Sequence, residues 1–207
     1  MLKKFAILLC CGFLTFNMKA QSFSGGAILG LSTSQVGGDN LAGFHKAGLL
    51  IGIFANKSIY QNLSFQMEMT YIQKGSENPK IDDVSDANYL KQDISSSYIE
   101  IPFLLKYHQS NNFSIEGGIQ TAYLIDAYYN DSYGKIESNN MSPFISYDIG
   151  LMIGLDYKYS KNISLNTRLS NSIFPIGTED YESQEIFGST RKGKYNLVLS
   201  FTLHYNI

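Results

Sequence analysis

The chain has 207 residues, of which 44% are hydrophobic, 14% aromatic and only 16% charged, and its formal net charge is −2. This length predicts a single domain. The lack of a basic excess argues against nucleic acid as a partner.

The first twenty residues predict a secretory signal peptide. Met1-Leu2-Lys3-Lys4 is basic, residues 5–16 are almost entirely apolar, and the small residue Ala20 precedes Gln21, which is the three-part pattern of such signals. A membrane anchor is the alternative, but a spanning helix needs about 20 apolar residues. A lipoprotein signal is disfavoured because the bulky Leu9 precedes Cys10. We expect cleavage after Ala20, with residues 21–207 forming the folded domain.

Cleavage would change both the cysteine count and the charge. Cys10 and Cys11 are the chain's two cysteines, so the mature chain would have no disulfide, thiol nucleophile or thiolate metal site. The signal also holds three of the 16 basic residues and none of the 18 acidic ones, which leaves 13 basic against 18 acidic residues. We therefore expect no nucleic-acid partner.

Eight segments of the mature chain predict β-strands. Two glycine-rich strands come first, and six strands of alternating apolar and polar residues follow; in chain order they are 23–32, 46–56, 63–71, 98–107, 113–125, 147–158, 163–170 and 194–207. The last is the clearest, since Leu197, Leu199 and Phe201 alternate with Val198, Ser200 and Thr202. Successive strand residues point to opposite sides of a sheet, so each segment has one apolar and one polar face.

The connections between these strands alternate in length. Segments 57–62, 109–112 and 160–162 are short polar turns, whereas 33–45, 75–93, 127–142 and 175–192 are long and polar. Outer-membrane barrels have short periplasmic turns and longer extracellular loops. An even number of strands then places both chain ends on the periplasmic side. Aromatic residues near both groups of connections suggest two girdles, although aromatic residues favour strands in general. Beside the short turns these are Tyr60, Tyr107, Phe113, Tyr157, Tyr159 and Tyr205, and near the long connections they are Tyr71, Tyr123, Tyr147, Phe174 and Tyr195.

The remaining question is which face of the barrel meets lipid. The polar face includes eight ionisable residues that we place in the interior: Glu68, Glu100, Lys106, Glu116, Asp148, Asp156, Arg168 and Lys194. A soluble lipocalin-like barrel would alternate equally well, with its apolar face inward. The export signal, the girdles and the loop asymmetry favour lipid outside, so we predict an all-β, eight-stranded antiparallel up-and-down transmembrane β-barrel with a polar interior, in the bacterial outer membrane and with membrane lipid as its partner.

Several motifs in order resemble the PorT-like outer-membrane β-barrel family. They are Gly26-x-x-x-Gly30-Leu31-x-Thr33, Lys46-Ala47-Gly48-x-x-x-Gly52, Leu63-Ser64-Phe65-Gln66-Met67-Glu68-x-x-Tyr71-x-Gln73-Lys74-Gly75, Tyr98-Ile99-Glu100-Ile101-Pro102-x-Leu104-x-Lys106-Tyr107 and Asp148-x-Gly150-x-x-x-Gly154. The resemblance covers essentially the whole mature chain and implies an eight-stranded outer-membrane barrel. It also accounts for Pro102, which is unusual within a paired strand and where we expect a bulge or local distortion. The member that names the family belongs to a protein-secretion apparatus, a role that the resemblance does not extend to this chain.

The inward charges are the first candidate for chemistry. An interior this narrow is filled by side chains, and buried charges require partners. We expect Lys106 diagonal to Glu116 and Arg168 opposite Met152, with Glu68, Glu100 or Asp148 as the carboxylate for Arg168. A structural salt-bridge core is favoured over a gated polar path.

No catalytic, cofactor or metal site is predicted. A Ser-His-carboxylate hydrolase would need a suitably placed histidine, and none of His45, His108 and His204 has these partners at convincing spacing. The acidic residues Asp82, Asp83 and Asp86 could ligate calcium, but a solvated acidic loop is favoured. The sequence therefore predicts a non-enzymatic outer-membrane scaffold that presents loops for binding or assembly with other envelope proteins. A subunit of a secretion apparatus, a narrow channel and a lipocalin-like binding barrel are the alternatives, and the oligomeric state is left open.

Overall fold

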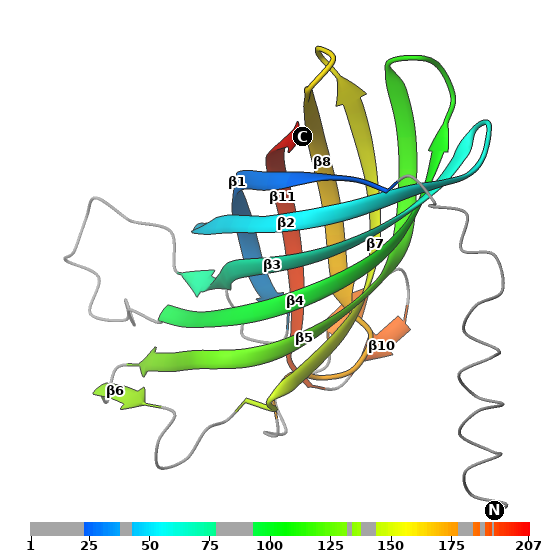
Figure 1. Ribbon diagram of the computed structural model, residues 1–207. Helices are drawn as coiled ribbons and strands as arrows, with labels where there is room; N and C mark the ends of the chain where they lie inside the picture. Colours follow the sequence, from blue (N-terminus) through cyan, green and yellow to red (C-terminus); the bar gives the residue numbers. More distant parts are fainter. Residues whose placement is uncertain are drawn as a thin grey trace, which may run out of the picture.

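Alternating side chains produce long antiparallel strands that close on themselves (Figure 1). The computed structural model describes residues 23–37, 43–77, 93–131, 134–137, 144–177, 184–186, 189–191 and 193–207. The eight barrel strands are β1 (Ser24–Gly37), β2 (Lys46–Tyr60), β3 (Leu63–Glu77), β4 (Asp93–His108), β5 (Phe113–Asp131), β7 (Tyr147–Lys158), β8 (Ile163–Ser172) and β11 (Tyr195–Asn206). The expected signal peptide, residues 1–20, lies outside the described residues.

Each barrel strand pairs with two neighbours. Sequential barrel strands are adjacent, β1 pairs with β11, and β4 pairs with β5, so the ring of eight strands is closed. In the described part of the chain three short strands lie outside the closed ring: β6 (Gly134–Glu137) pairs with the end of β5, and β9 (Gln184–Ile186) pairs with β10 (Ser189–Arg191). The predicted eight-stranded antiparallel barrel is therefore confirmed. No helix among the described residues is long and apolar enough to cross a membrane.

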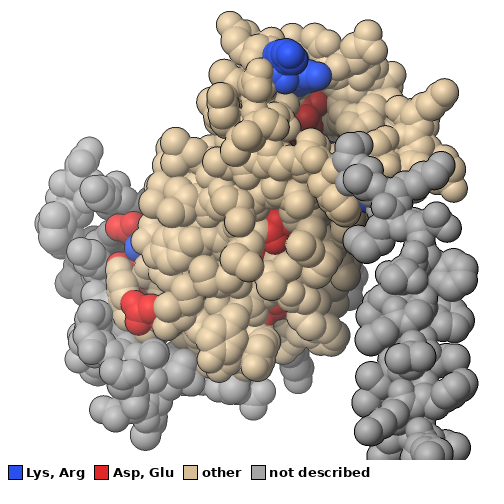
Figure 2. All heavy atoms as spheres, in the orientation of Figure 1, with Lys and Arg blue, Asp and Glu red and all other residues tan. Residues whose placement is uncertain are grey.

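The two faces of the barrel wall are inverted relative to a soluble protein. Alternate residues of β7 such as Leu151 and Ile153 are 57% and 60% exposed on the outside, whereas Asp148 and Asp156 on the same strand are buried. Figure 2 shows the resulting wall, which is mostly free of charged groups. An apolar exterior around a polar interior suits lipid outside, so the lipocalin-like alternative is wrong.

Most strands extend further than expected at the end with the long loops. β3 continues from Tyr71 to Glu77, β4 begins at Asp93 rather than near Tyr98, and β5 runs to Asp131. Tyr123 and Tyr147 are both exposed and meet edge to face at 5.3 Å between ring centroids. The strands thus continue past the outer aromatic girdle. Outside the bilayer their outward-facing residues need not be apolar, so the alternating pattern ends before the strands do.

The structure differs from the predicted barrel in two details, at Pro102 and at Tyr195. The β3–β4 ladder is interrupted at Pro102, which is the local distortion that we expected, but no bulge forms there because the pairing resumes in the same register; the register shift in β4 lies between Ser97 and Tyr98 on the β5 side. Tyr195, which we expected in the outer girdle, is buried. Tyr60, Tyr107, Tyr159 and Tyr205 are exposed beside the short turns as expected.

Candidate functional site in the barrel interior

Arg168 is the hub of a buried ion-pair network on the inner face of the barrel. Its Nη1 and Nη2 donate to Glu68 Oε2 and Oε1 at 2.8 and 2.9 Å, and its Nε donates to Glu116 Oε1 at 2.7 Å. All three residues are buried, and they come from β8, β3 and β5. A bidentate guanidinium–carboxylate pair fixes the orientation of the two side chains in addition to pairing their charges. The network thus connects three strands that do not pair with one another.

Lys106 extends this network toward the short-turn end. Its Nζ lies 3.2 Å from Glu116 Oε2 and 3.3 Å from Asp156 Oδ2. Asn166 also donates to Asp156 Oδ2 at 3.5 Å, and Gln66 donates to Glu68 Oε1 at 2.6 Å. Each ion therefore has both a counter-charge and hydrogen bonds, which is what burial of charge requires.

The exact cross-strand pairs differ from the predicted ones. Lys106 lies directly opposite Glu116 rather than diagonal to it, and Arg168 faces Gly154 rather than Met152. The β7–β8 hairpin closes through two hydrogen bonds to Ile163 O, from Tyr159 N and Ser160 N, each 3.0 Å. A turn closed at this point sets the register two residues away from the expected one.

A second network, nearer the long loops, centres on Lys74, which was not among the eight residues predicted to lie in the interior. Lys74 is fully buried, pairs with Glu100 and lies 3.4 Å from Asp148 Oδ2. Asn196 donates to Asp148 Oδ2 at 3.0 Å, and Lys74 Nζ lies 5.0 Å from the ring centroid of Tyr98. Lys74 shares the inward phase of Glu68, so extending the alternation past Tyr71 would have found it. Lys194, the last of the eight predicted interior residues, is also buried.

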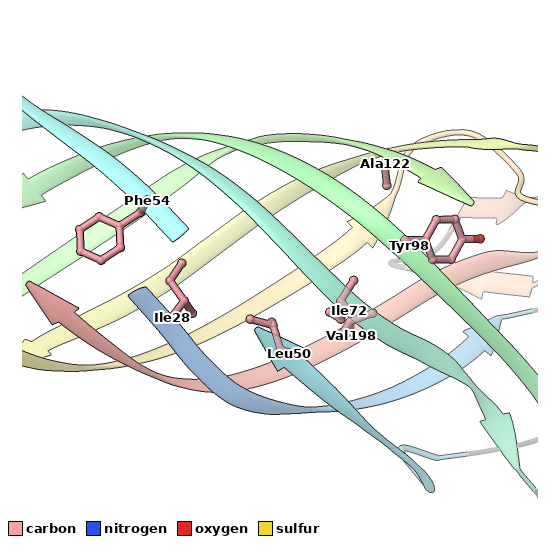
Figure 3. Close-up of a cluster of buried hydrophobic side chains, with 7 residues drawn as sticks. All are labelled: Ile28, Leu50, Phe54, Ile72, Tyr98, Ala122 and Val198. Carbon is pink, nitrogen blue, oxygen red and sulfur yellow. The ribbon is translucent and has the colours of Figure 1, made fainter. Parts of the chain in front are cut away.

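Two clusters of apolar side chains also lie in the interior. One cluster consists of Ile28, Leu50, Phe54, Ile72, Tyr98, Ala122 and Val198 (Figure 3). A second lies at the long-loop end, where Phe144 and Ile176 pack with Val36, Ile94 and Ala127. Phe144 bridges to Gly177, and Ile145 N donates to Ile176 O at 2.8 Å. Two segments that precede β7 and follow β8 therefore place apolar residues in the outer end of the barrel.

A separate ion pair, between Lys46 and Asp93, lies closer to the long loops than the exposed aromatic pair Tyr123 and Tyr147. Lys46 Nζ is 2.7 Å from Asp93 Oδ1, and Tyr128 Oη donates to Asp93 Oδ2 at 2.9 Å. Burial lowers the pKa of Lys46, but the hydrogen bond and charge of Asp93 outweigh it and leave that pKa above the usual lysine value. This pair is partly exposed, so its expected contribution to stability is small.

The short-turn end, in contrast, contains a polar cavity of about 370 Å³, which we call the cup. Its described lining residues are Ser24, Phe54, Asn56, Gln66, Lys106, His108, Asn111, Asn112, Ser114, Asp156, Lys158, Lys161, Ser164, His204 and Asn206. By the turn-length rule of outer-membrane barrels the cup faces the periplasm.

The histidines near the cup are bonded to hydroxyls. His108 lies 3.0 Å from Ser64 Oγ through Nε2 and 2.8 Å from Ser114 Oγ through Nδ1. His204 Nε2 lies 3.0 Å from Thr202 Oγ1, and the His204 ring is 5.3 Å from that of Phe54. A catalytic triad needs a carboxylate on the second ring nitrogen, and at His108 a serine occupies that place.

The described residues contain no group of three or more His, Cys, Asp or Glu side chains that could hold a metal ion. The candidate calcium ligands Asp82, Asp83 and Asp86 lie outside the described residues.

The sequence profile of the outer membrane protein beta-barrel domain matches residues 15–177 of the chain. The chain belongs to this outer-membrane β-barrel family. Its place is therefore the bacterial outer membrane, with lipid around the apolar wall. No curated protein sequence matches it.

Solved structures support the same fold. Ail, the attachment invasion locus protein of Yersinia pestis, is 10% identical with a TM-score of 0.53, and the match covers 89% of this chain and 98% of Ail. Ail in complex with the heparin analogue sucrose octasulfate matches at 10% identity and a TM-score of 0.51, covering 90% and 99% of the two chains. At this identity the similarity concerns the fold alone.

Proposed function

We propose that this outer-membrane barrel is a non-enzymatic scaffold that presents its long outer connections for binding or assembly with other envelope proteins. The observation that carries the proposal is the filled outer half of the barrel. The Lys74 network and the cluster around Phe144 and Ile176 occupy the space through which a solute would have to pass. Seven of the eight predicted interior residues then have a structural role, since each of them has an ionic partner: Glu68, Glu100, Lys106, Glu116, Asp148, Asp156 and Arg168.

The proposal includes export and processing. Residues 1–20 would act as the signal peptide and residues 21–207 as the barrel domain. The hydroxyl partners of His108 support the non-enzymatic part, because they take the place of the carboxylate that would orient a catalytic imidazole.

A narrow channel is the second candidate, because charged side chains line much of the interior. Discrete current steps in planar bilayers, altered by Arg168→Ala, would favour a channel over a scaffold. A PorT-like subunit of a secretion apparatus is the third candidate and is supported by the motif resemblance. A defined set of co-purifying envelope proteins would favour it.

Replacement of an outer connection tests the scaffold role. Residues 78–92 join β3 to β4, and we expect a short Gly-Ser linker in their place to leave the barrel folded, because long surface insertions contribute little to barrel closure. Chemical cross-linking of whole cells should give adducts with the native chain that are weakened or lost in this variant. The comparison variant replaces residues 178–183, in another outer connection, with a Gly-Ser segment of the same length as these residues.

Heat-dependent gel mobility verifies that each variant still forms a closed barrel. The scaffold proposal is contradicted if the native chain gives no adduct, or if adducts persist when all four long outer connections are replaced.

A further inference from the structure

The cup at the short-turn end has a rigid mouth. Three turn asparagines accept backbone hydrogen bonds from the neighbouring strand ends: His108 N to Asn62 O at 2.8 Å, Lys158 N to Asn112 O at 2.8 Å, and Asn206 N to Asn162 O at 2.7 Å. The short turns are thus tied to one another around the rim. A mouth fixed in this way would lose little conformational freedom when a ligand binds.

Basic residues outnumber acidic residues in the described lining of the cup. Lys106, Lys158 and Lys161 are basic, whereas Asp156 is the one acidic residue among the described lining residues. Lys106 is shared between Glu116 and Asp156, which leaves Lys158 and Lys161 at the mouth as the excess positive charge of the described lining. Figure 2 shows basic groups at the end where Figure 1 draws the short turns.

The neighbourhood of His108 agrees with a positive cup. His108 is the last residue of β4 and lies at the rim, beyond the membrane-spanning part. Burial, followed by the positive charge of Lys106, lowers its pKa, and Lys158 acts in the same direction against the opposing charge of Asp156.

The remaining lining supplies neutral donors and one apolar surface. Asn111, Asn112 and Ser164 can donate side-chain hydrogen bonds, whereas Asn56 already donates to Ser64 and Gln66. Phe54 and His204 form an aromatic pair within the cavity wall. A volume of about 370 Å³ lies in the range of small-molecule sites.

We propose that the cup binds, from the periplasmic side, a small polar molecule with a phosphate or carboxylate group. Lys158 and Lys161 hold the anion at the mouth, and the asparagine and serine side chains hold the polar remainder. This site is at the opposite end of the barrel from the outer connections, so it goes beyond the scaffold role and can fail independently of it.

Calorimetric titration of the full mature barrel in detergent tests the proposal, with glucose 6-phosphate as the anionic probe and glucose as its neutral counterpart. We expect saturable binding of glucose 6-phosphate, no binding of glucose, and a loss of affinity of about tenfold or more in Lys158→Gln/Lys161→Gln, because charge-assisted hydrogen bonds are removed. Rising salt should weaken the binding, since the mouth is exposed. Lys57→Gln is the matched control: Lys57 lies over the ring of Phe23 and is not part of the cup lining.

A second variant changes the charge in the other direction. Asp156→Asn removes the acidic lining residue and should tighten binding of glucose 6-phosphate severalfold, provided its heat-dependent gel mobility shows a closed barrel. Short-chain phosphatidylglycerol is titrated in parallel, and binding of this lipid alone would support the anion site with a headgroup as the source. Absence of saturable binding for both anions would overturn the proposal. So would equal binding of glucose, or an affinity in the double lysine variant equal to that of Lys57→Gln.

Discussion

Arg168→Ala is expected to lower the free energy of unfolding by about 3–5 kcal/mol, because removing one partner of a buried ion pair leaves uncompensated charge in a low-dielectric interior. Two carboxylates, Glu68 and Glu116, would lose their shared guanidinium at once. Glu116 would keep Lys106, whereas Glu68 would retain the amide of Gln66. Urea unfolding in lipid vesicles, followed by heat-dependent gel mobility, measures the change.

Two comparison variants separate charge from general disruption. Lys46→Met breaks an ion pair that is partly exposed and should cost less than about 1 kcal/mol. The triple variant Glu68→Gln, Glu116→Gln, Arg168→Met removes the charges together and should recover much of the loss, since buried ion pairs can be replaced at little cost. If Arg168→Ala were no more destabilising than Lys46→Met, the network would not hold the interior together.

Ile153→Lys is expected to cost about 2–4 kcal/mol, the penalty for a lysine on the lipid face near the bilayer midplane. Ile153 is 60% exposed on the outside of β7 and lies between Tyr147 and Tyr157, which are both exposed toward the two ends of the strand. In a soluble barrel a lysine at such an exposed position would be harmless.

The matched control for this variant is Ser160→Lys, in the turn that follows β7, where the expected cost is below about 1 kcal/mol because lipid-face penalties fall toward the interface. Both variants are unfolded from vesicles of the same lipid. Equal stabilities of the two variants would show that Ile153 does not face the membrane interior.

The strands and their faces could be predicted because period-two alternation is a local property of the sequence. Alternation did not by itself decide which face was inward; the export signal, the aromatic girdles and the loop asymmetry did. It failed at Lys74, because Gln73 and Gly75 on either side are not apolar once β3 leaves the bilayer. Tyr195 was misassigned for the related reason that proximity to a long connection says nothing about what covers a side chain.

Non-local contacts were beyond the sequence analysis. Phe144 and Ile176 lie in connecting segments outside the alternating strands, and their packing on Ile94 depends on how those segments return to the barrel. The position of Arg168 opposite Gly154 depends on the closure of one hairpin. The cup was missed because Lys158 ends β7 and Lys161 lies in the short turn that follows, and both gain significance only beside the strands around them.

Tryptophan quenching tests the central claim, a barrel with lipid outside and polar residues inside. The chain contains no tryptophan, so a single introduced tryptophan reports alone. In vesicles with bromine-labelled acyl chains, Ile153→Trp should be strongly quenched and blue-shifted. Phe54→Trp, in the wall of the cup, should resist the lipid quencher and respond to aqueous iodide. Quenching of Phe54→Trp by lipid together with quenching of Ile153→Trp by iodide would mean that the two faces are inverted.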